Sequence, residues 1–322
     1  MKKLSIYITT YNRVKYLKTM VSSILDQTFK DFDLYILDNC SSDGTDRFVA
    51  SICDPRVHYV KHPQNIGGLA NLNYSFEQCD NEYFCVLHDD DIAHNTLIEK
   101  EITYMERHME CAAVSCLANN IDETGKEIKT CHVKNGDPVK KYSNTDFFEN
   151  YISHQETLTF PATMYRNSFI KEHNIVLKQK PGPCRDVVLY MDIEKAGGIL
   201  AEIQEALFDY RIHRNQDSTT NLERMLIQLI QYLNQDDYYS TLLNKCKTGK
   251  ECYYRWYARR LLIRVASKAT TYHEAVEYLK EMKNELDGAD ACYWSTRVFL
   301  YLERVFPGLF ENGYRLIKSK RN

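Results

Sequence analysis

Three consecutive acidic residues, Asp89 to Asp91, directly follow an apolar segment, residues 83–88, that has the pattern of a buried strand. Carboxylates at the end of a buried strand are costly unless a positive charge joins them. Because side chains alternate faces in an extended segment, Asp89 and Asp91 are expected to point one way and Asp90 the other. Two such carboxylates can share a hard divalent cation that also binds phosphate oxygens. An acidic turn that caps the next helix is the alternative.

Three further residues could take part in chemistry beside this acidic segment. Asp38 ends a second apolar segment, where it could bond the base or ribose of a nucleotide or be an ordinary turn residue. His213 stands between Arg211 and Arg214; the imidazole could ligate the metal while the arginines hold phosphate, or it could be a satisfied histidine. Asp186 precedes a predicted helix, where it could accept the proton of an attacking hydroxyl or act as an N-cap.

These residues need a scaffold, and the first 120 residues alternate strand and helix patterns. Short apolar segments predict strands, and apolar residues at helical spacing predict helices between them. This alternation indicates an α/β fold with a mostly parallel sheet that helices cover on both faces. Ligands bind beyond the carboxyl ends of the strands in such sheets. Four polar segments are expected at that edge, residues 9–13, 38–44, 64–68 and 88–91.

The alternation becomes irregular after residue 120. Residues 123–126 have the composition of a hairpin tip, a helix is predicted near 187–196, and residues 199–212 have the pattern of two short strands. From residue 221 the pattern is helical almost to the end. We therefore expect an α/β domain over residues 1–220 and an all-helical C-terminal region over residues 221–322.

The composition is that of a globular protein, with 44% hydrophobic and 26% charged residues. A net charge of −3 argues against general nucleic-acid binding. The 11 cysteines are odd in number and include no Cys-x-x-Cys pair, which predicts reduced thiols in a cytoplasmic protein rather than a disulfide framework. Neither a signal peptide nor a membrane span is predicted.

The charge is unevenly distributed along the chain. From Lys245 to the end there are 16 Lys/Arg and 9 Asp/Glu, a balance of +7, which leaves −10 for the rest of a chain of net charge −3. Aromatic residues accompany the basic ones. Basic amphipathic helices with aromatic residues suit an anionic membrane surface, which predicts peripheral contact with the inner face of the plasma membrane. A helical cap or a homodimer interface within residues 245–322 is the alternative.

Several reaction classes lack their motifs in this chain. It has no G-x-x-x-x-G-K-[ST] loop of a P-loop ATPase and no G-x-G-x-x-G after the first predicted strand, as a dinucleotide dehydrogenase would have. It also has no G-x-S-x-G of a hydrolase and no His/Cys cluster with the spacing of a structural zinc site.

Five short segments, taken together, resemble the motifs of family 2 glycosyltransferases and follow the same order. The resemblance covers about residues 1–220 and is quite specific as a set, although each motif alone is weak. The segments are Thr9-Thr10-Tyr11-Asn12-Arg13, Asp38-Asn39-Cys40-Ser41-Ser42-Asp43-Gly44-Thr45, Asn65-Ile66-Gly67-Gly68 with Asn71, His88-Asp89-Asp90-Asp91, and Tyr210-Arg211-Ile212-His213.

The resemblance implies a GT-A fold, with a nucleotide-binding half over residues 1–118 and an acceptor-side half over residues 119–220. It implies an inverting glycosyltransferase of the bacterial surface-polysaccharide type. A set of residues would bind the nucleotide of the donor: Thr9, Tyr11, Arg13, Asp38, Asn65, Gly68, Asn71, Asp89 and Asp90. Asp89 and Asp91 take the places of the family's D-x-D motif, and with His213 they would hold Mn²⁺ or Mg²⁺.

The resemblance also implies a catalytic base. Asp186 falls where the family carries its catalytic acidic pair, although here the preceding residue is Arg185. The expected reaction moves a hexose from a nucleotide diphosphate to a hydroxyl of a glycan or a lipid-linked acceptor. UDP is the nucleotide that the resemblance implies. Metal would stabilise the leaving diphosphate, and Asp186 would take the proton of the attacking oxygen.

Two other functions remain open from the sequence. A sugar nucleotidyltransferase shares the sheet type and the metal carboxylates, but it would need a Gly-rich, basic loop after the first strand, and residues 9–13 contain no glycine. A non-catalytic partner that binds sugar nucleotides or glycans is the second. Such a protein would be expected to lose Asp91 or the candidate base, and both are present.

Overall fold

The computed structural model describes residues 2–131, 137–213, 222–286 and 290–305, except for the side chains of residues 290–292. The chain forms two compact units. Unit 1 consists of Met1–Phe147, Thr157–Gln179 and Asp186–Gln216, and unit 2 of Phe148–Glu156, Lys180–Arg185 and Asp217–Asn322. Two short segments upstream of the predicted boundary at residue 220 therefore group with the C-terminal helices.

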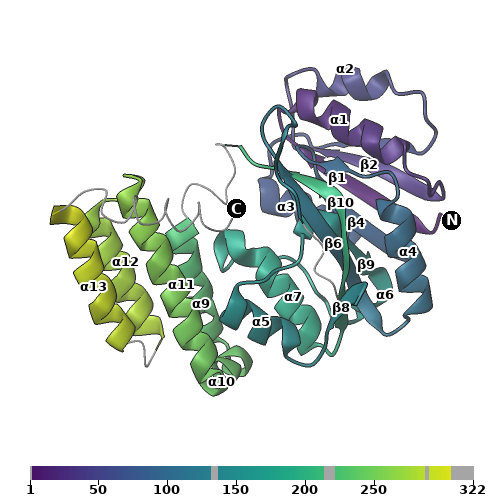
Figure 1. The fold of residues 1–322 in the computed structure, drawn as a ribbon. Helices are drawn as coiled ribbons and strands as arrows, with labels where there is room; N and C mark the ends of the chain where they lie inside the picture. The colour runs from purple at the N-terminus through teal and green to yellow at the C-terminus, as the bar shows by residue number, and fades with distance from the viewer. Residues whose placement is uncertain (1, 132–136, 214–221, 287–289, 306–322) are drawn as a thin grey trace. The chain divides into compact units, whose positions relative to one another are not determined.

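Unit 1 is built on one sheet, with the strand order β3-β2-β1-β4-β9-β6-β10-β5 among the described residues, β7 beside β6 and β8 beside β10 (Figure 1). The strands are β1 (Leu4–Thr10), β2 (Phe32–Asp38), β3 (Val57–Lys61), β4 (Tyr83–His88), β5 (Ile92–Ala93), β6 (Cys111–Ile121), β7 (Glu127–Lys129), β8 (Val139–Tyr142), β9 (Thr163–Arg166) and β10 (Ile199–Arg211).

The sheet is mixed, and its two parallel parts are separated by one strand. Pairing is parallel across β3, β2, β1 and β4, and again between β6 and β10. Strand β9 runs antiparallel to both β4 and β6. The alternation of strands and helices predicts the parallel part, whereas β9 belongs to the irregular region in which no such alternation exists.

Helices cover both faces of this sheet. The helices in or entering unit 1 are α1 (Val14–Leu25), α2 (Thr45–Ala50), α3 (Gly68–Gln78), α4 (Leu97–Arg107), α5 (Asp146–His154), α6 (Asn167–Glu172) and α7 (Arg185–Lys195), and there are short 3₁₀ turns η1 (Phe160–Ala162) and η2 (Gly182–Cys184). The helix predicted near residues 187–196 is α7.

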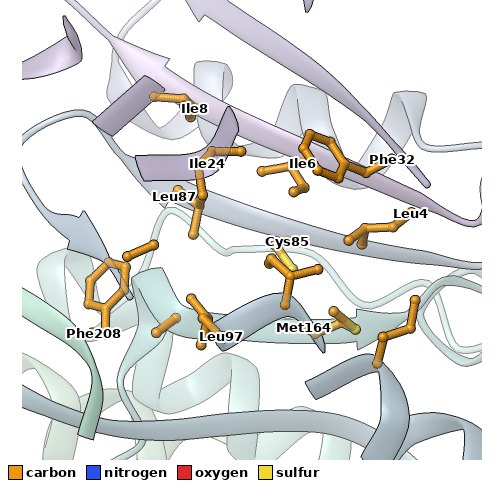
Figure 2. Close-up of a cluster of buried hydrophobic side chains, with 14 of the residues drawn as sticks. Leu4, Ile6, Ile8, Ile24, Phe32, Cys85, Leu87, Leu97, Met164 and Phe208 are labelled. Atoms are coloured by element: carbon orange, nitrogen blue, oxygen red, sulfur yellow. The ribbon is translucent and has the colours of Figure 1, made fainter. Parts of the chain in front are cut away.

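Alternate residues of the strands point to one face and pack against α1 and α4. The buried side chains on this face form a hydrophobic core, which includes Leu4, Ile6 and Ile8 of β1 and Cys85 and Leu87 of β4 (Figure 2). On the opposite face, Phe76 of α3 packs edge-on against Phe84, and the hydroxyls of Tyr190 in α7 and Thr163 in β9 lie 2.8 Å apart. Both faces of the central strands are therefore buried, as their nearly continuous apolar sequence predicts.

The residues predicted as two short strands form the single strand β10. Its pairing with β6 contains register shifts between Ile203 and Ala206 and between Ala206 and Phe208. The polar residues Gln204 and Glu205 lie in this irregular stretch. A β-bulge accommodates extra residues without ending the strand, which explains why the polar interruption resembles a turn in the sequence.

Unit 2 is helical in its described residues, with α9 (Leu222–Gln235), α10 (Asp237–Lys245), α11 (Lys247–Ala266), α12 (Tyr272–Glu285) and α13 (Asp290–Val305). Asp236 caps α10 through its side chain, and Thr271 with Glu274 forms a capping box at the start of α12. Helix α12 packs against α9, α11 and α13.

The described cysteines are free thiols, and Cys79, Cys85, Cys111, Cys116 and Cys184 are buried. Among the described residues, no helix combines the length and the hydropathy needed to cross a bilayer.

Candidate active site

The acidic segment lies at the carboxyl end of β4, next to the carboxyl end of β1 in the parallel part of the sheet. Strand β4 ends at His88, and the chain turns through Asp89 and Asp90 before the short strand β5. The three carboxylates are almost completely buried, with 3%, 5% and 1% of their surface exposed. Because the segment turns, the alternation of an extended chain does not apply to it, and each carboxylate has different partners.

Asp89 faces β1 and the start of α1. Its Oδ2 accepts a hydrogen bond of 2.6 Å from the Thr10 hydroxyl, and Nη1 of Arg13 lies 3.3 Å from its Oδ1. Burial raises the pKa of Asp89 to about 7, and the negative charge of Asp90 adds to this rise, while Thr10 and Arg13 oppose it. Thr10 and Arg13 thus bond the two oxygens of the Asp89 carboxylate, one each.

Asp90 is surrounded by positive and polar groups. Nη1 of Arg13 lies 2.9 Å from its Oδ2, and Nε2 of His213 lies 2.8 Å from the same oxygen. Burial alone would raise the pKa of Asp90, but His88, His213 and Arg13 outweigh this effect, and the net pKa is lowered. Of the three carboxylates, Asp90 is therefore the one whose ionised form is favoured by its surroundings.

Asp91 has one satisfied and one unsatisfied oxygen. Its Oδ1 accepts a hydrogen bond of 2.8 Å from the backbone N–H of Arg211, whereas its buried Oδ2 accepts none from the described residues. Burial raises the pKa of Asp91 well above its usual range, and the charge of Asp90 adds to the effect. A buried, unsatisfied carboxylate oxygen of this kind needs a positive partner.

His88, Asp90 and Asp91 each offer one ligand atom, and these atoms all lie within 4.8 Å of one another. In the described part of the chain this is the group of His, Cys, Asp and Glu residues that could hold a metal ion. An imidazole and two carboxylates can ligate Mn²⁺, and carboxylates suit Mg²⁺ as well. A cation bound by this group would be a positive partner for Asp91, whose buried Oδ2 accepts no hydrogen bond from the described residues, so the donor set fits a divalent cation.

The glycosyl transferase family 2 model matches residues 5–173, slightly more than half of the chain. The chain belongs to glycosyl transferase family 2. Its central sheet flanked by helices is the GT-A fold of such glycosyltransferases.

Known glycosyltransferases resemble this chain at low identity. An uncharacterized glycosyltransferase of Haemophilus influenzae is 26% identical over 226 residues, which are 67% of each chain. The O-antigen biosynthesis glycosyltransferase WbnJ of Escherichia coli is 25% identical over 68% of this chain and 83% of its own length. The crystal structure of residues 1–349 of TarS from S. aureus, in complex with UDP-GlcNAc, superimposes with a TM-score of 0.68 at 14% identity, covering 97% of this chain and 92% of that TarS fragment.

Other residues expected to bind the nucleotide occupy the same edge of the family 2 sheet. Thr9 lies at the end of β1, with its hydroxyl 3.5 Å from the carbonyl oxygen of Leu87, and Tyr11 is 46% exposed. Asp38 is fully buried at the end of β2, where its carboxylate accepts hydrogen bonds from the Tyr59 hydroxyl and the Ser41 N–H. Because Asp38 is fully buried, side chains around it must move before a nucleotide can contact its carboxylate.

The loop between β3 and α3 contains the remaining expected residues. Asn65 accepts hydrogen bonds from Asn39 and from the backbone N–H of Gly67, which joins this loop to the one after β2. Gly68 begins α3, and no atom lies within 4 Å of where its Cβ would be. Asn71 is buried, bonded to His62 and to the Leu37 carbonyl. Asn65 and Asn71 thus shape the loop through their side chains.

Asp186 occupies the first turn of α7 and is partly buried. Burial raises the pKa of the phenols of Tyr165 and Tyr190, and the negative charge of Asp186 adds to both rises. Asp186 therefore lies near these two tyrosines. Tyr165 belongs to β9 and packs against Phe76 of α3, and the Tyr190 hydroxyl lies 2.8 Å from that of Thr163.

Sequence reasoning did not identify His88 as a possible metal ligand, nor Thr10 as a partner of Asp89. His88 is the last residue of β4 and stands directly before the acidic residues, so its position at the strand end is the signal that could have indicated it. Of the predicted metal ligands, Asp91 belongs to the group of ligand atoms, whereas Asp89 bonds Thr10 and Arg13, and His213 bonds Asp90.

Arg211 was expected to hold phosphate, but its guanidinium has other partners in the structure. Its guanidinium donates to the carbonyl oxygens of Asp90, Asp122 and Glu123, and it stacks over the ring of Tyr16 at 5.1 Å. Arg211 is 4% exposed. Its guanidinium is therefore part of the framework that holds the acidic segment in place.

Proposed function

We propose that this family 2 enzyme is an inverting, metal-dependent glycosyltransferase that transfers a hexose from a nucleotide diphosphate donor to an acceptor hydroxyl. Membership in the family supports glycosyl transfer itself. The observation that carries metal dependence is the group formed by His88, Asp90 and Asp91, together with the buried, unsatisfied Oδ2 of Asp91.

Mn²⁺ or Mg²⁺ held by His88, Asp90 and Asp91 would supply the Lewis acid that stabilises the negative charge of the leaving diphosphate. Of the other two ligands predicted from the sequence, His213 bonds Asp90 directly, and Asp89 is linked to Asp90 through Arg13. The chain itself fixes the acidic residues, because Thr10, Arg13 and the backbone of Arg211 bind carboxylate oxygens before any ligand arrives.

Arg13 has a second role in this proposal. Its side chain bridges Asp89 and Asp90 and yet remains 37% exposed, so the guanidinium can also meet a phosphate oxygen of the donor. Asp186 accepts the proton of the acceptor hydroxyl as its oxygen attacks the anomeric carbon on the face opposite to the leaving diphosphate. Attack from that face inverts the configuration of the sugar.

The donor proposed is a UDP-sugar and the acceptor a glycan or lipid-linked hydroxyl in surface-polysaccharide assembly. UDP-GlcNAc is the ligand of the TarS structure, which supports UDP as the nucleotide. The relative WbnJ acts in O-antigen biosynthesis, which supports the polysaccharide setting.

The decisive experiment measures hydrolysis of a panel of UDP- and GDP-sugars with Mn²⁺, with Mg²⁺ and with EDTA. We expect release of the nucleoside diphosphate from at least one donor, abolished by EDTA. Asp91→Asn should reduce this release by a factor on the order of 10² or more, because a buried anionic ligand is lost. Asp80→Asn, a change at a side chain that is 87% exposed and lies before the amino end of β4, is the matched control and should retain full activity.

The alternatives give different products. Release of pyrophosphate when the protein is supplied instead with UTP and a sugar 1-phosphate would identify a sugar nucleotidyltransferase, and calorimetric binding of a UDP-sugar without any hydrolysis would indicate a non-catalytic binding protein. Full activity in EDTA would reject the metal-dependent mechanism while leaving glycosyl transfer itself in place.

A further inference from the structure

Exposed apolar side chains are concentrated on the last described helix, α13. Five of the thirteen exposed large hydrophobic residues in the described part of the chain belong to it: Trp294, Val298, Phe299, Tyr301 and Val305. A soluble surface normally carries such residues singly. Their concentration on one helix indicates a surface that meets another partner.

The spacing of these residues separates α13 into two faces. Tyr293, Thr296, Leu300 and Glu303 recur every three or four residues, are at most 6% exposed, and lie on the side that packs against α11 and α12. Trp294, Val298, Tyr301 and Val305 recur at the same spacing on another side and are 46% to 60% exposed. We call these four residues the outer face of α13. The helix lies at the edge of the helical unit, next to α12 (Figure 1).

The charges around the outer face are positive. Arg297 and Arg304 flank it, and Lys283 of α12 lies 4.8 Å from the centre of the Tyr293 ring. From Tyr293 to Val305 the one acidic residue is Glu303, and it is 4% exposed. The side chains of Glu281 and Glu285 in α12 accept hydrogen bonds from Gln231 and Asn234 of α9. The exposed part of α13 therefore presents apolar and aromatic side chains beside a row of cations.

We propose that the outer face of α13 binds the surface of an anionic phospholipid bilayer, with the helix lying in the plane of the interface. Tryptophan and tyrosine favour the headgroup level, valine enters the acyl boundary, and arginines bind lipid phosphates. A second copy of this chain is the less suitable occupant. If two outer faces met, Arg297 and Arg304 of each helix would flank the same seam, and like charges at such positions oppose pairing.

The test is flotation of the full-length protein with vesicles of phosphatidylcholine, alone or with 30 to 40% phosphatidylglycerol (about one anionic lipid in three). We expect binding to the anionic vesicles and several-fold less to the neutral ones. Trp294→Ser/Val298→Ser/Tyr301→Ser should reduce the bound fraction at least tenfold. Arg297→Gln/Arg304→Gln should weaken binding to anionic vesicles by about fivefold for each arginine and barely change binding to neutral ones.

Matched control variants separate this face from general surface effects. Met109→Ser/Ile128→Ser removes two residues of unit 1 that are 67% and 57% exposed, and Arg255→Gln/Arg259→Gln removes two exposed arginines of α11. Both controls should float like the unchanged protein. Because the substituted side chains are exposed, except for the partly buried Arg297, circular dichroism should stay constant across the set and the melting temperature should change little.

Three outcomes would overturn the proposal. The unchanged protein fails to float with anionic vesicles, the outer-face variant floats as well as the unchanged protein, or sedimentation reveals a dimer that this variant loses, which would assign the face to a second copy. The inference goes beyond the proposed function and does not depend on it, because flotation needs no donor and no metal. Donor hydrolysis in solution, measured on the same variants, should be unchanged.

Discussion

The backbone N–H of Arg211 lies 2.8 Å from Oδ1 of Asp91 and donates a hydrogen bond to it, although the two residues are 120 positions apart in the chain. The bond joins the end of β10 to the turn after β4. The guanidinium of the same arginine donates to the carbonyl oxygen of Asp90 and to those of Asp122 and Glu123. One buried residue thus fixes both the side chain of Asp91 and the backbone of the acidic turn.

Arg211→Lys should weaken Mn²⁺ binding while the protein stays folded. Lysine keeps the backbone N–H that bonds Asp91, but it cannot reproduce the fork that holds the carbonyl oxygens of Asp90 and Asp122. Loss of groups that orient metal ligands typically reduces metal affinity about 10- to 100-fold. Isothermal titration with Mn²⁺, in the presence of UDP, measures this change.

Arg166→Lys is the matched control for that experiment. Arg166 is also buried, and its guanidinium donates to the carbonyl oxygens of Cys111, Met105 and His108, away from the acidic segment. We expect the melting temperature of this variant to fall, while its Mn²⁺ affinity stays within about twofold of that of the unchanged protein. Arg166 and the acidic segment share no hydrogen-bond partner, so the two sites should behave independently. Equal loss of affinity in both variants would show that Arg211 acts only through general stability.

Asp186→Asn should preserve donor binding and abolish turnover. Asparagine has nearly the same shape but cannot accept a proton, and removal of a positioned general base costs a factor of about 10² to 10⁴ in rate. Hydrolysis of the donor, with water in place of the acceptor, measures turnover, and calorimetry with the UDP-sugar measures binding. Asp192→Asn, on the same helix and paired with Lys178 at 2.7 Å, is the control. Normal turnover by Asp186→Asn would remove this residue from the role of base.

The sequence was sufficient to predict the architecture around the site. Apolar segments and helical stripes determined the order of β1 to β4 and the intervening helices, because burial of both sheet faces leaves a regular pattern. The rule that ligands bind at the carboxyl ends of parallel strands then pointed to the segment after His88, where the structure places the buried carboxylates.

The individual contacts could not be predicted in the same way. Asp90 and His213 are 123 positions apart, and no local pattern encodes a bond between them. The expectation that Asp89 and Asp91 share a face assumed an extended chain, but the chain turns at Asp89, so that His88, Asp90 and Asp91 are the residues whose ligand atoms converge. Side-chain directions within a turn depend on its geometry, which composition alone does not determine.

The thiols should differ sharply in reactivity. Cys53 is exposed, whereas burial raises the pKa of Cys85 and of Cys116 well above the usual range of a thiol. Because the thiolate is the reactive form, a disulfide reagent at pH 8 should label Cys53 rapidly and the two buried residues only as the protein unfolds. Mass spectrometry of the native and denatured protein would locate the label. Fast labelling of Cys85 in the native state would contradict the buried core around β4.

Glu101→Gln should stabilise the protein, by an amount that grows with pH. Glu101 lies in α4 with 1% of its surface exposed, and its Oε1 accepts no hydrogen bond from the described residues. Burial raises the pKa of this carboxyl well above its usual value. The folded protein therefore keeps Glu101 protonated at pH values where the unfolded chain, with a pKa near 4.3, has already lost the proton.

The sign of the pH dependence follows from this difference. Below about pH 4.3 both states are protonated and Glu101 has no pH-dependent effect, whereas above it the unfolded state is favoured by about 1.4 kcal/mol for each pH unit until the folded pKa is reached. Glutamine has no proton to lose, so its advantage over glutamate should increase from pH 5 to pH 7. Urea unfolding at three pH values in this range measures the difference in the free energy of unfolding. Glu99→Gln, at an exposed position of the same helix, should show no such slope, and a parallel pH profile for Glu101→Gln and the unchanged protein would mean that Glu101 is ionised in the folded state.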